Sequence, residues 1–228
     1  MTQTTPPAEQ APAVLPPALR GWFGPVAGLA ASVVALLAFR YAGEGEPGTL
    51  DARIGAAVDG VRPPWRSVAL FLDSLGEPVG ATALVAVLVT GCLVLRRPRA
   101  AVFGVAAIGL TVGAATLLKH LVGRTIHGDN LSYPSGHTAF ATALALVPAL
   151  LATGRRGHHG PGPGPGFRSG LALAAAAAAG AAMGWAQVAL GAHYPTDALA
   201  GWCTALAVVP ATAWLVDRTA DAGRPERR

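Results

Sequence analysis

Of the 228 residues in the chain, 52% are hydrophobic and only 13% are charged, against about 25% charged in an average soluble domain. This composition excludes an ordinary soluble protein and indicates a membrane protein. The formal net charge of +5 does not indicate nucleic-acid binding, because the arginines cluster in short segments between apolar runs, as in cytoplasmic loops of membrane proteins.

Residues 1–20 are Pro-rich and lack the basic-then-apolar order of a signal peptide, so they are predicted to form a disordered cytoplasmic tail. The first apolar run, residues 22–41, is long enough to span a hydrocarbon core, which takes about 20 helical residues. Residues 43–66 are mixed in character. Within them, apolar residues recur at a spacing of four from Leu50 to Val58, which predicts a short amphipathic helix on the membrane surface.

The remaining apolar runs predict five further spans: residues 79–95, 101–118, 138–152, 171–190 and 198–216. Gly76-Glu77-Pro78 ends the preceding apolar run, which is too short to span, and Pro78 can begin the next helix. The Ala-rich run 171–190 is expected inside the bundle, because small side chains let helices approach closely.

The alternating Gly and Pro of residues 154–168 predict a loop, and His158 and His159 are better explained as part of a solvated linker than as metal ligands. The predicted fold class is all-α: a six-span transmembrane helical bundle over residues 21–217, with a short interfacial helix in the first outer loop. A basic cytoplasmic tail, residues 218–228, follows it.

The arginines also predict an orientation. The turn 96–99, the loop 154–168 and the C-terminal tail all fall on one side of the bundle, which the positive-inside rule makes cytoplasmic. Segment 43–66 carries further arginines on the opposite side and mildly contradicts this assignment. The prediction is a multi-pass plasma-membrane protein with both termini in the cytoplasm.

A polar segment between two apolar runs begins at Lys119, the only lysine of the chain, and ends in Pro-Ser-Gly-His at His137. Ser135 is a good N-cap for the helix that follows, and Gly136 lets a ligand approach the backbone closely. Free N–H groups at a helix start favour an anion, beside which His137 would lie. Taken alone, a capped helix with an interfacial histidine explains this pattern better, and snorkelling explains Lys119.

A second polar segment, from His193 to Asp197, precedes the last predicted span. Pro195 suits the first turn of a helix, where the helix dipole also favours Asp197. A carboxylate one turn beyond a histidine can accept its Nδ1–H and leave Nε2 as a free lone pair. That is the geometry of an oriented base or nucleophile, although the spacing alone is a weak signal.

Together, Lys119, Pro-Ser-Gly-His and the His193–Asp197 spacing resemble the type 2 phosphatidic acid phosphatase superfamily, the integral-membrane lipid phosphate phosphatases, over about residues 50–216. The resemblance implies that His193 is the nucleophile and forms a phosphohistidine, that Asp197 orients it, and that His137 donates a proton to the leaving group. It implies that Lys119, Ser135 and Gly136 hold phosphate oxygens. It implies no metal and no other cofactor.

Two arginines that this family uses to hold phosphate are absent. The family's Arg-Pro falls on Ile126-His127, and its Ser-Arg falls on Ala186-Gln187. A hydrogen bond to a charged group is worth about 1.5–3 kcal/mol, so the phosphate site is weakened unless other side chains compensate. The candidates for compensation are Arg124, His120, His127 and Gln187.

The leading interpretation is an outward-facing, metal-independent membrane phosphatase acting on a lipid phosphate or prenyl diphosphate. Its partners would be the lipid substrate and the bilayer. The alternative is a non-catalytic member of the family that binds lipid phosphate or acts as a scaffold, which the missing arginines favour. A transporter is less favoured, because charged residues lie at the ends of the predicted spans and not in mid-membrane. The sequence leaves the lipid and the oligomeric state open.

Overall fold

The computed structural model describes residues 14, 20–58, 60–153 and 165–222. Nearly all of the predicted N-terminal tail, the Gly-Pro loop up to residue 164 and the last residues of the C-terminal tail lie outside this part of the chain, and so do His158 and His159. Within it, the helices and strands follow in this order: α1 (Arg20–Arg40), α2 (Thr49–Val58), α3 (Trp65–Gly76), α4 (Pro78–Val94), α5 (Pro98–Val122), β1 (Thr125–Ile126), β2 (Asn130–Leu131), α6 (Gly136–Thr153), α7 (Pro165–Ala189) and α8 (Pro195–Ala222).

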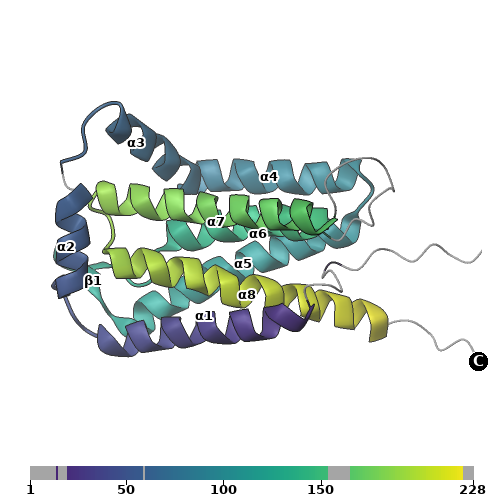
Figure 1. The fold of residues 1–228 in the computed structure, drawn as a ribbon, viewed down its shortest axis with the longest axis horizontal. Helices are drawn as coiled ribbons and strands as arrows, with labels where there is room; N and C mark the ends of the chain where they lie inside the picture. The colour runs from purple at the N-terminus through teal and green to yellow at the C-terminus, as the bar shows by residue number, and fades with distance from the viewer. Residues whose placement is uncertain (1–13, 15–19, 59, 154–164, 223–228) are drawn as a thin grey trace, which may run out of the picture.

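Five helices in the described residues are long and apolar enough to cross a membrane: α1, α5, α6, α7 and α8. Helices α3 and α4 meet the same criterion as a pair bent by 67° and make a sixth candidate span. Figure 1 shows the long helices and α4 running side by side, with α2 across one end of the bundle. The prediction of an all-α, six-span bundle with a short interfacial helix is therefore confirmed, except that the second span, predicted as residues 79–95 alone, is formed by α3 and α4 together.

The break in that span lies at the predicted point. Helix α3 ends at Gly76, Glu77 is extended with φ −66° and ψ 156°, and α4 begins at Pro78. A residue before proline avoids the helical region, and proline suits the first helical position because it has no N–H to satisfy. The sequence Gly-Glu-Pro therefore ends one helix and starts another in a new direction.

Helix α2 confirms the predicted interfacial helix, but its buried side is the acidic one. Asp51 is 2% exposed, while Leu50 and Ile54 are 56% and 41% exposed. The helix thus turns a carboxylate toward the bundle and apolar side chains away from it. That arrangement suits a helix lying at a lipid surface.

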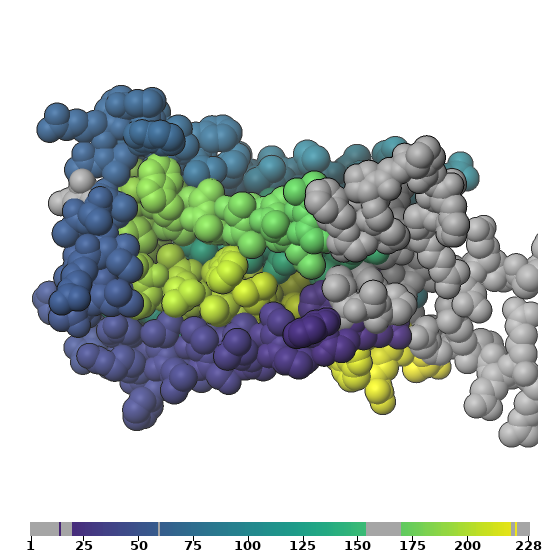
Figure 2. All heavy atoms as spheres, viewed as in Figure 1, coloured from purple at the N-terminus to yellow at the C-terminus, as the bar shows by residue number. Residues whose placement is uncertain are grey.

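Helix α7 begins inside the predicted loop, because Pro165 occupies the first helical position. The expectation that this Ala-rich helix lies inside the bundle is met on one face only. Ala176, Met183 and Ala186 are buried against the neighbouring helices, whereas Figure 2 shows the opposite face of α7 open at the surface of the bundle. Small residues do allow close approach, since a Cβ on Gly180 would lie 2.3 Å from Oγ1 of Thr142 in α6.

The starts of α6 and α8 lie against each other at the α2 end of the bundle. The N–H of Ser135 donates to the carbonyl of Asp197 at 2.9 Å, and a Cβ on Gly201 would lie 2.3 Å from the carbonyl oxygen of Ser135. Only glycine allows two helix backbones to approach so closely. This contact brings the two polar segments of the sequence to one place.

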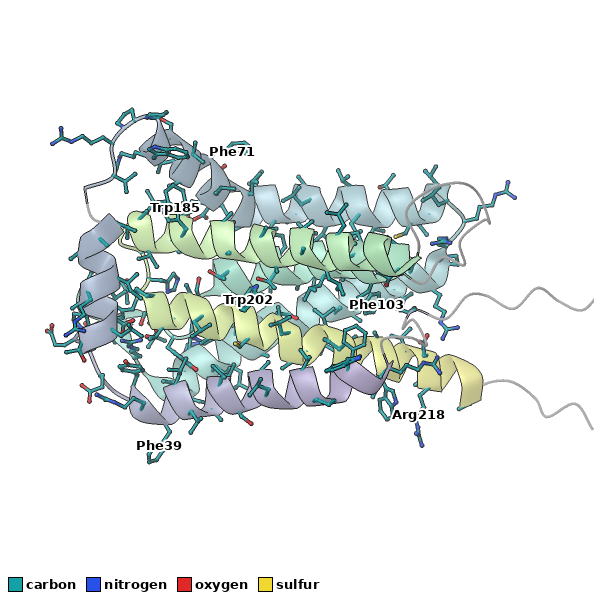
Figure 3. The ribbon with its side chains drawn as sticks, viewed as in Figure 1. Phe39, Phe71, Phe103, Trp185, Trp202 and Arg218 are labelled. Carbon is teal, nitrogen blue, oxygen red and sulfur yellow. The ribbon has the colours of Figure 1, made fainter. Side chains whose placement is uncertain are left out.

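Aromatic side chains mark both ends of the bundle. Near the α2 end, the rings of Trp65 and Trp185 meet edge to face at 6.3 Å, and Figure 3 shows Phe39 pointing away from the helices. At the other end, the guanidinium of Arg218 lies 5.2 Å from the ring centre of Trp214. Tryptophan is enriched at the two membrane–water interfaces, so these rings support a bundle that spans a bilayer.

Candidate active site

His193 and Asp197 lie beside each other where α7 passes into α8. A tight turn with Gly191 at φ 71° carries the chain to His193. Oδ2 of Asp197 accepts the N–H of Tyr194 at 3.1 Å, so this carboxylate caps its own helix. The same oxygen is 3.9 Å from Nδ1 of His193, which is longer than a hydrogen bond. The two side chains are placed as a pair, at a separation of the kind that often tightens only when substrate binds.

The surroundings of His193 favour its neutral form. Its side chain is 9% exposed, and burial lowers the pKa of this histidine below its ordinary value. The Asp197 carboxylate opposes this effect, whereas charges on Lys119 and His137 lower the pKa of His193 further. A neutral imidazole offers the lone pair that a nucleophile requires.

His137 lies in the first turn of α6 and packs against the bend between α3 and α4. Its Nε2 is 3.6 Å from a carboxylate oxygen of Asp73 and 3.6 Å from one of Glu77. A Cβ on Gly76 would lie 2.2 Å from Cδ2 of the His137 ring. The glycine at the break is therefore what allows the imidazole to occupy this position.

Asp73, Glu77 and His137 also form the group within the described residues whose side-chain atoms could hold a metal ion, since these atoms all lie within 4.8 Å of one another. The His137 ring therefore lies beside two acidic side chains from the α3–α4 bend.

Lys119, Ser135 and Gly136 surround the start of α6. Nζ of Lys119 donates to the carbonyl of Leu131 at 2.8 Å. Oγ of Ser135 accepts the N–H of Thr138 at 3.3 Å, which makes it the predicted helix cap. A Cβ on Gly136 would meet nothing within 4 Å, so there is open space beside this residue.

Arg124, a candidate replacement for the missing phosphate-binding arginines, does not lie at the start of α6 with an open guanidinium. Its side chain is completely buried, with NH1 2.6 Å from Oδ1 of Asp197 and NH2 2.7 Å from Oδ2 of Asp51. The rings of Tyr41 and Tyr194 lie 3.9 Å and 4.3 Å from the guanidinium carbon. Two carboxylates and two aromatic rings thus hold this arginine behind the His193–Asp197 pair.

The other two predicted phosphate ligands also contact protein groups. Nε2 of Gln187 donates to Oδ1 of Asp73 at 2.7 Å. His127 is exposed, and its ring nitrogen is 2.8 Å from the carbonyl of Gly191. Gln187 thus supports the carboxylate beside His137, and His127 ties the β1–β2 turn to the loop that carries His193.

Three acidic residues of the site were not predicted from the sequence: Asp51, Asp73 and Glu77. Asp51 and Asp73 lie in helices α2 and α3, where an acidic residue on an amphipathic pattern predicts a solvated face. Glu77 was only weakly indicated by the sequence, since it stands in the Gly-Glu-Pro segment predicted to separate two helices. Their partners come from distant parts of the chain, which a linear reading does not show.

These features define a class: a multi-pass membrane protein with a buried histidine–aspartate pair and a second histidine at one end of a helical bundle. The sequence model of the PAP2 superfamily matches residues 99–221, which is more than half of the chain. The chain belongs to the PAP2 superfamily, and the resemblance of its polar segments to phosphatidic acid phosphatases of type 2 is confirmed.

One solved structure has a similar fold: the first transmembrane PAP2-type phosphatidylglycerolphosphate phosphatase from Bacillus subtilis. The TM-score is 0.63 at 19% sequence identity, and the match covers 90% of this chain and 98% of that chain. At 19% identity, this similarity shows that the two chains share a fold. No curated protein matches the chain.

The Gly76 contact generates the first prediction. Gly76→Ala should lower kcat by about 100-fold, because the added methyl displaces His137, and general acid–base groups contribute about 10²–10⁴-fold. The matched control is Gly91→Ala in α4, where a Cβ meets nothing within 4 Å. The control should keep wild-type kcat in a phosphate-release assay, with both variants folded by circular dichroism. Equal activity of the two variants would contradict the contact.

The burial of Arg124 generates the second prediction. Arg124→Met should lower the free energy of unfolding by about 3–5 kcal/mol, because it leaves two buried carboxylates without their cation. Arg124→Lys should recover only part of this loss, since an ammonium group lacks the planar fork that reaches both carboxylates. Denaturant unfolding in detergent measures both values. Arg53→Met, on the exposed side of α2, is the control and should change stability little; an equally mild effect of Arg124→Met would show that the network is not formed.

Proposed function

We propose that this protein is a membrane phosphatase that hydrolyses a lipid phosphate or prenyl diphosphate through a phosphohistidine on His193. The observation that carries the proposal is the buried His193 beside Asp197, with His137 and Lys119 near enough to lower its pKa. A neutral nucleophile, an orienting carboxylate and a proton donor are the groups that such a reaction needs.

The proposed reaction has two steps. In the first, the Nε2 lone pair of His193 attacks the terminal phosphorus, the bond from this phosphorus to the leaving oxygen breaks, and His137 protonates that oxygen. The leaving oxygen is the lipid oxygen of a monophosphate or the bridging oxygen of a diphosphate. In the second, water attacks the phosphohistidine, His137 takes a proton from the water, and phosphate leaves with His193 restored. Asp197 stabilises the positive imidazole while the phosphorus–nitrogen bond exists.

The phosphate group is proposed to bind at the start of α6. Phosphoryl transfer requires positive groups where charge gathers on the equatorial oxygens. Lys119 and the N–H groups of Gly136 and His137 are the donors assigned here, because the N–H of Ser135 already donates to Asp197. The open space beside Gly136 gives an oxygen atom room to approach.

The alternative function, a non-catalytic protein that binds lipid phosphate, has one observation in its favour. The guanidinium of Arg124 is occupied by two carboxylates, which leaves few cations for the transferred phosphoryl group. A binder would release no phosphate from any lipid tested. A lipid phosphate would still raise its melting temperature.

The proposal extends to location and metal requirement. The arginine distribution supports a plasma-membrane protein with both termini in the cytoplasm and the active site outside. The reaction is proposed to need no metal ion, since the two histidines supply both the nucleophile and the proton. Chelation with EDTA should then leave activity unchanged. If EDTA removed activity and a divalent metal restored it, the metal-free scheme would be wrong.

The third prediction concerns mechanism and pH. His193→Ala and His137→Ala should each remove most turnover of a phosphatidate or prenyl diphosphate substrate, while His158→Ala in the Gly-Pro loop should not. Only neutral His193 can attack, and burial lowers its pKa, so the acid limb of a bell-shaped dependence of kcat/KM on pH should lie below histidine's ordinary pKa of about 6.5. Trapping of labelled phosphate on the wild type and not on His193→Ala checks the intermediate. A half-maximal acid limb above pH 7 would contradict a neutral buried nucleophile.

The fourth prediction concerns orientation. Single cysteines placed at Gly128 and at Gly162, in a chain whose Cys92 and Cys203 are replaced by alanine, report the two ends of the bundle. On intact cells, an impermeant thiol reagent should label the cysteine at 128 and leave the one at 162 unlabelled. Labelling at 162 with protection at 128 would reverse the orientation and place the active site in the cytoplasm.

A further inference from the structure

Asp51 is a buried carboxylate on α2 whose partners all belong to the active-site end of the bundle. Its Oδ1 accepts the N–H of Thr196 at 2.9 Å. Its Oδ2 accepts the Thr196 hydroxyl at 2.9 Å and the Arg124 guanidinium at 2.7 Å. The residue therefore contacts both the segment that precedes β1 and the first turn of α8.

Arg124 connects Asp51 to the proposed catalytic pair, because it binds both Asp51 and Asp197. One nitrogen of its guanidinium binds Asp51, and the other binds both Oδ1 of Asp197 at 2.6 Å and Oγ1 of Thr196 at 2.7 Å. With Oδ1 held in this way, Oδ2 of Asp197 is the oxygen that faces Nδ1 of His193. The Asp197 carboxylate is thus oriented from two sides: Oδ2 accepts the N–H of Tyr194, and Oδ1 is held by hydrogen bonds that lead through Arg124 to α2.

We infer that Asp51 is a positioning residue, which fixes Arg124 and through it holds the Asp197 carboxylate against His193. The inference rests on the proposed phosphatase function and adds to it a role for α2 that the histidine motifs do not include. It also assigns Arg124 to positioning, because a side chain with no exposed surface cannot reach a phosphate without breaking two ion pairs.

Asp51 can influence the position of Asp197 because the two carboxylates bind the same guanidinium. With both carboxylates present, Arg124 is shared between Asp51 and Asp197, and the rings of Tyr41 and Tyr194 hold it in plane. Without the charge on Asp51, the guanidinium is free to shift toward Asp197 and bind both of its oxygens, as arginine–carboxylate pairs tend to do. That shift draws Oδ2 away from His193. The negative charge of Asp197 raises the pKa of His193, so this histidine then protonates at a lower pH.

The fifth prediction tests this role with Asp51→Asn. In a phosphate-release assay on the full chain, kcat should fall about 10- to 100-fold, because small displacements of catalytic groups cost factors of this size. KM should stay within about threefold, because Asp51 does not touch substrate. The matched control is Asp129→Asn, an exposed residue of the β1–β2 turn, which should keep wild-type kcat.

A second measurement does not depend on turnover. The rate at which diethyl pyrocarbonate modifies His193, followed by mass spectrometry from pH 4 to 8, gives the pH at which this histidine becomes neutral. The midpoint should move to lower pH in Asp51→Asn and stay in place in Asp129→Asn. A residue with only a structural role would lower the amount of folded protein and leave the midpoint of the folded fraction unchanged.

Thr196→Val serves if Asp51→Asn does not fold, since it removes only the hydroxyl that joins Asp51 to Arg124 and keeps the shape of the side chain. It should lower kcat about 3- to 10-fold and move the His193 midpoint the same way. Wild-type kcat with an unshifted midpoint, in either variant, overturns the inference and leaves the phosphatase proposal intact. If the wild type releases no phosphate from any lipid, the proposed function fails, and the His193 midpoint alone decides the role of Asp51.

Discussion

The guanidinium of Arg124 is the group on which the active-site end of this bundle depends. It joins α2, the segment before β1 and the start of α8 through two carboxylates. It also lies over the ring of Tyr41, the residue that follows α1. Ion pairs removed from water add little net stability, because desolvation cancels most of their attraction. Their effect is to make any arrangement with an unpaired buried charge unfavourable. The four segments therefore keep one fixed position relative to one another.

Two positions where the resemblance to the family implies arginine carry other side chains, and these side chains are packed into the bundle. The chain carries isoleucine and glutamine at those positions. Ile126 is 8% exposed and Gln187 is 1% exposed, so both side chains are integrated into the fold. Gln187 donates to Asp73, which flanks His137. The residue that replaces a phosphate ligand has thereby become a support for the proposed proton donor.

Much of the fold could be predicted because it depends on local chemistry. The lengths of apolar runs predicted the spans, and proline at a first helical position predicted where α4 begins. The Ser135 cap was also predictable, since it needs only the three residues that follow. Each of these features has its cause within one continuous stretch of sequence.

The arrangement of charge at the site could not be predicted in this way. Asp51 and Arg124 are 73 positions apart, and Arg124 and Asp197 are again 73 positions apart. Arg124 was predicted to bind phosphate because it is a cation close to a histidine motif. The sequence does not show that two buried carboxylates already neutralise this arginine. The spacing from Leu50 to Val58 predicted α2 correctly, but it did not show that Asp51 faces the bundle, since no helical pattern tells a solvated acid from a paired one.

The bend between α3 and α4 has a consequence for the depth at which His137 lies. Helix α4 has 17 residues, which cover roughly 25 Å at 1.5 Å per residue, whereas a hydrocarbon core is about 30 Å thick. With one end of α4 at the far boundary of that core, the bend lies several ångströms inside the near boundary, and His137 packs against it. In the proposed reaction, the head group of a lipid phosphate must then sink below the plane of its neighbours to reach His137. The proposal thereby makes bilayer thickness a determinant of substrate access, because a thinner membrane brings the phosphate level with the histidine and a thicker one buries the histidine further.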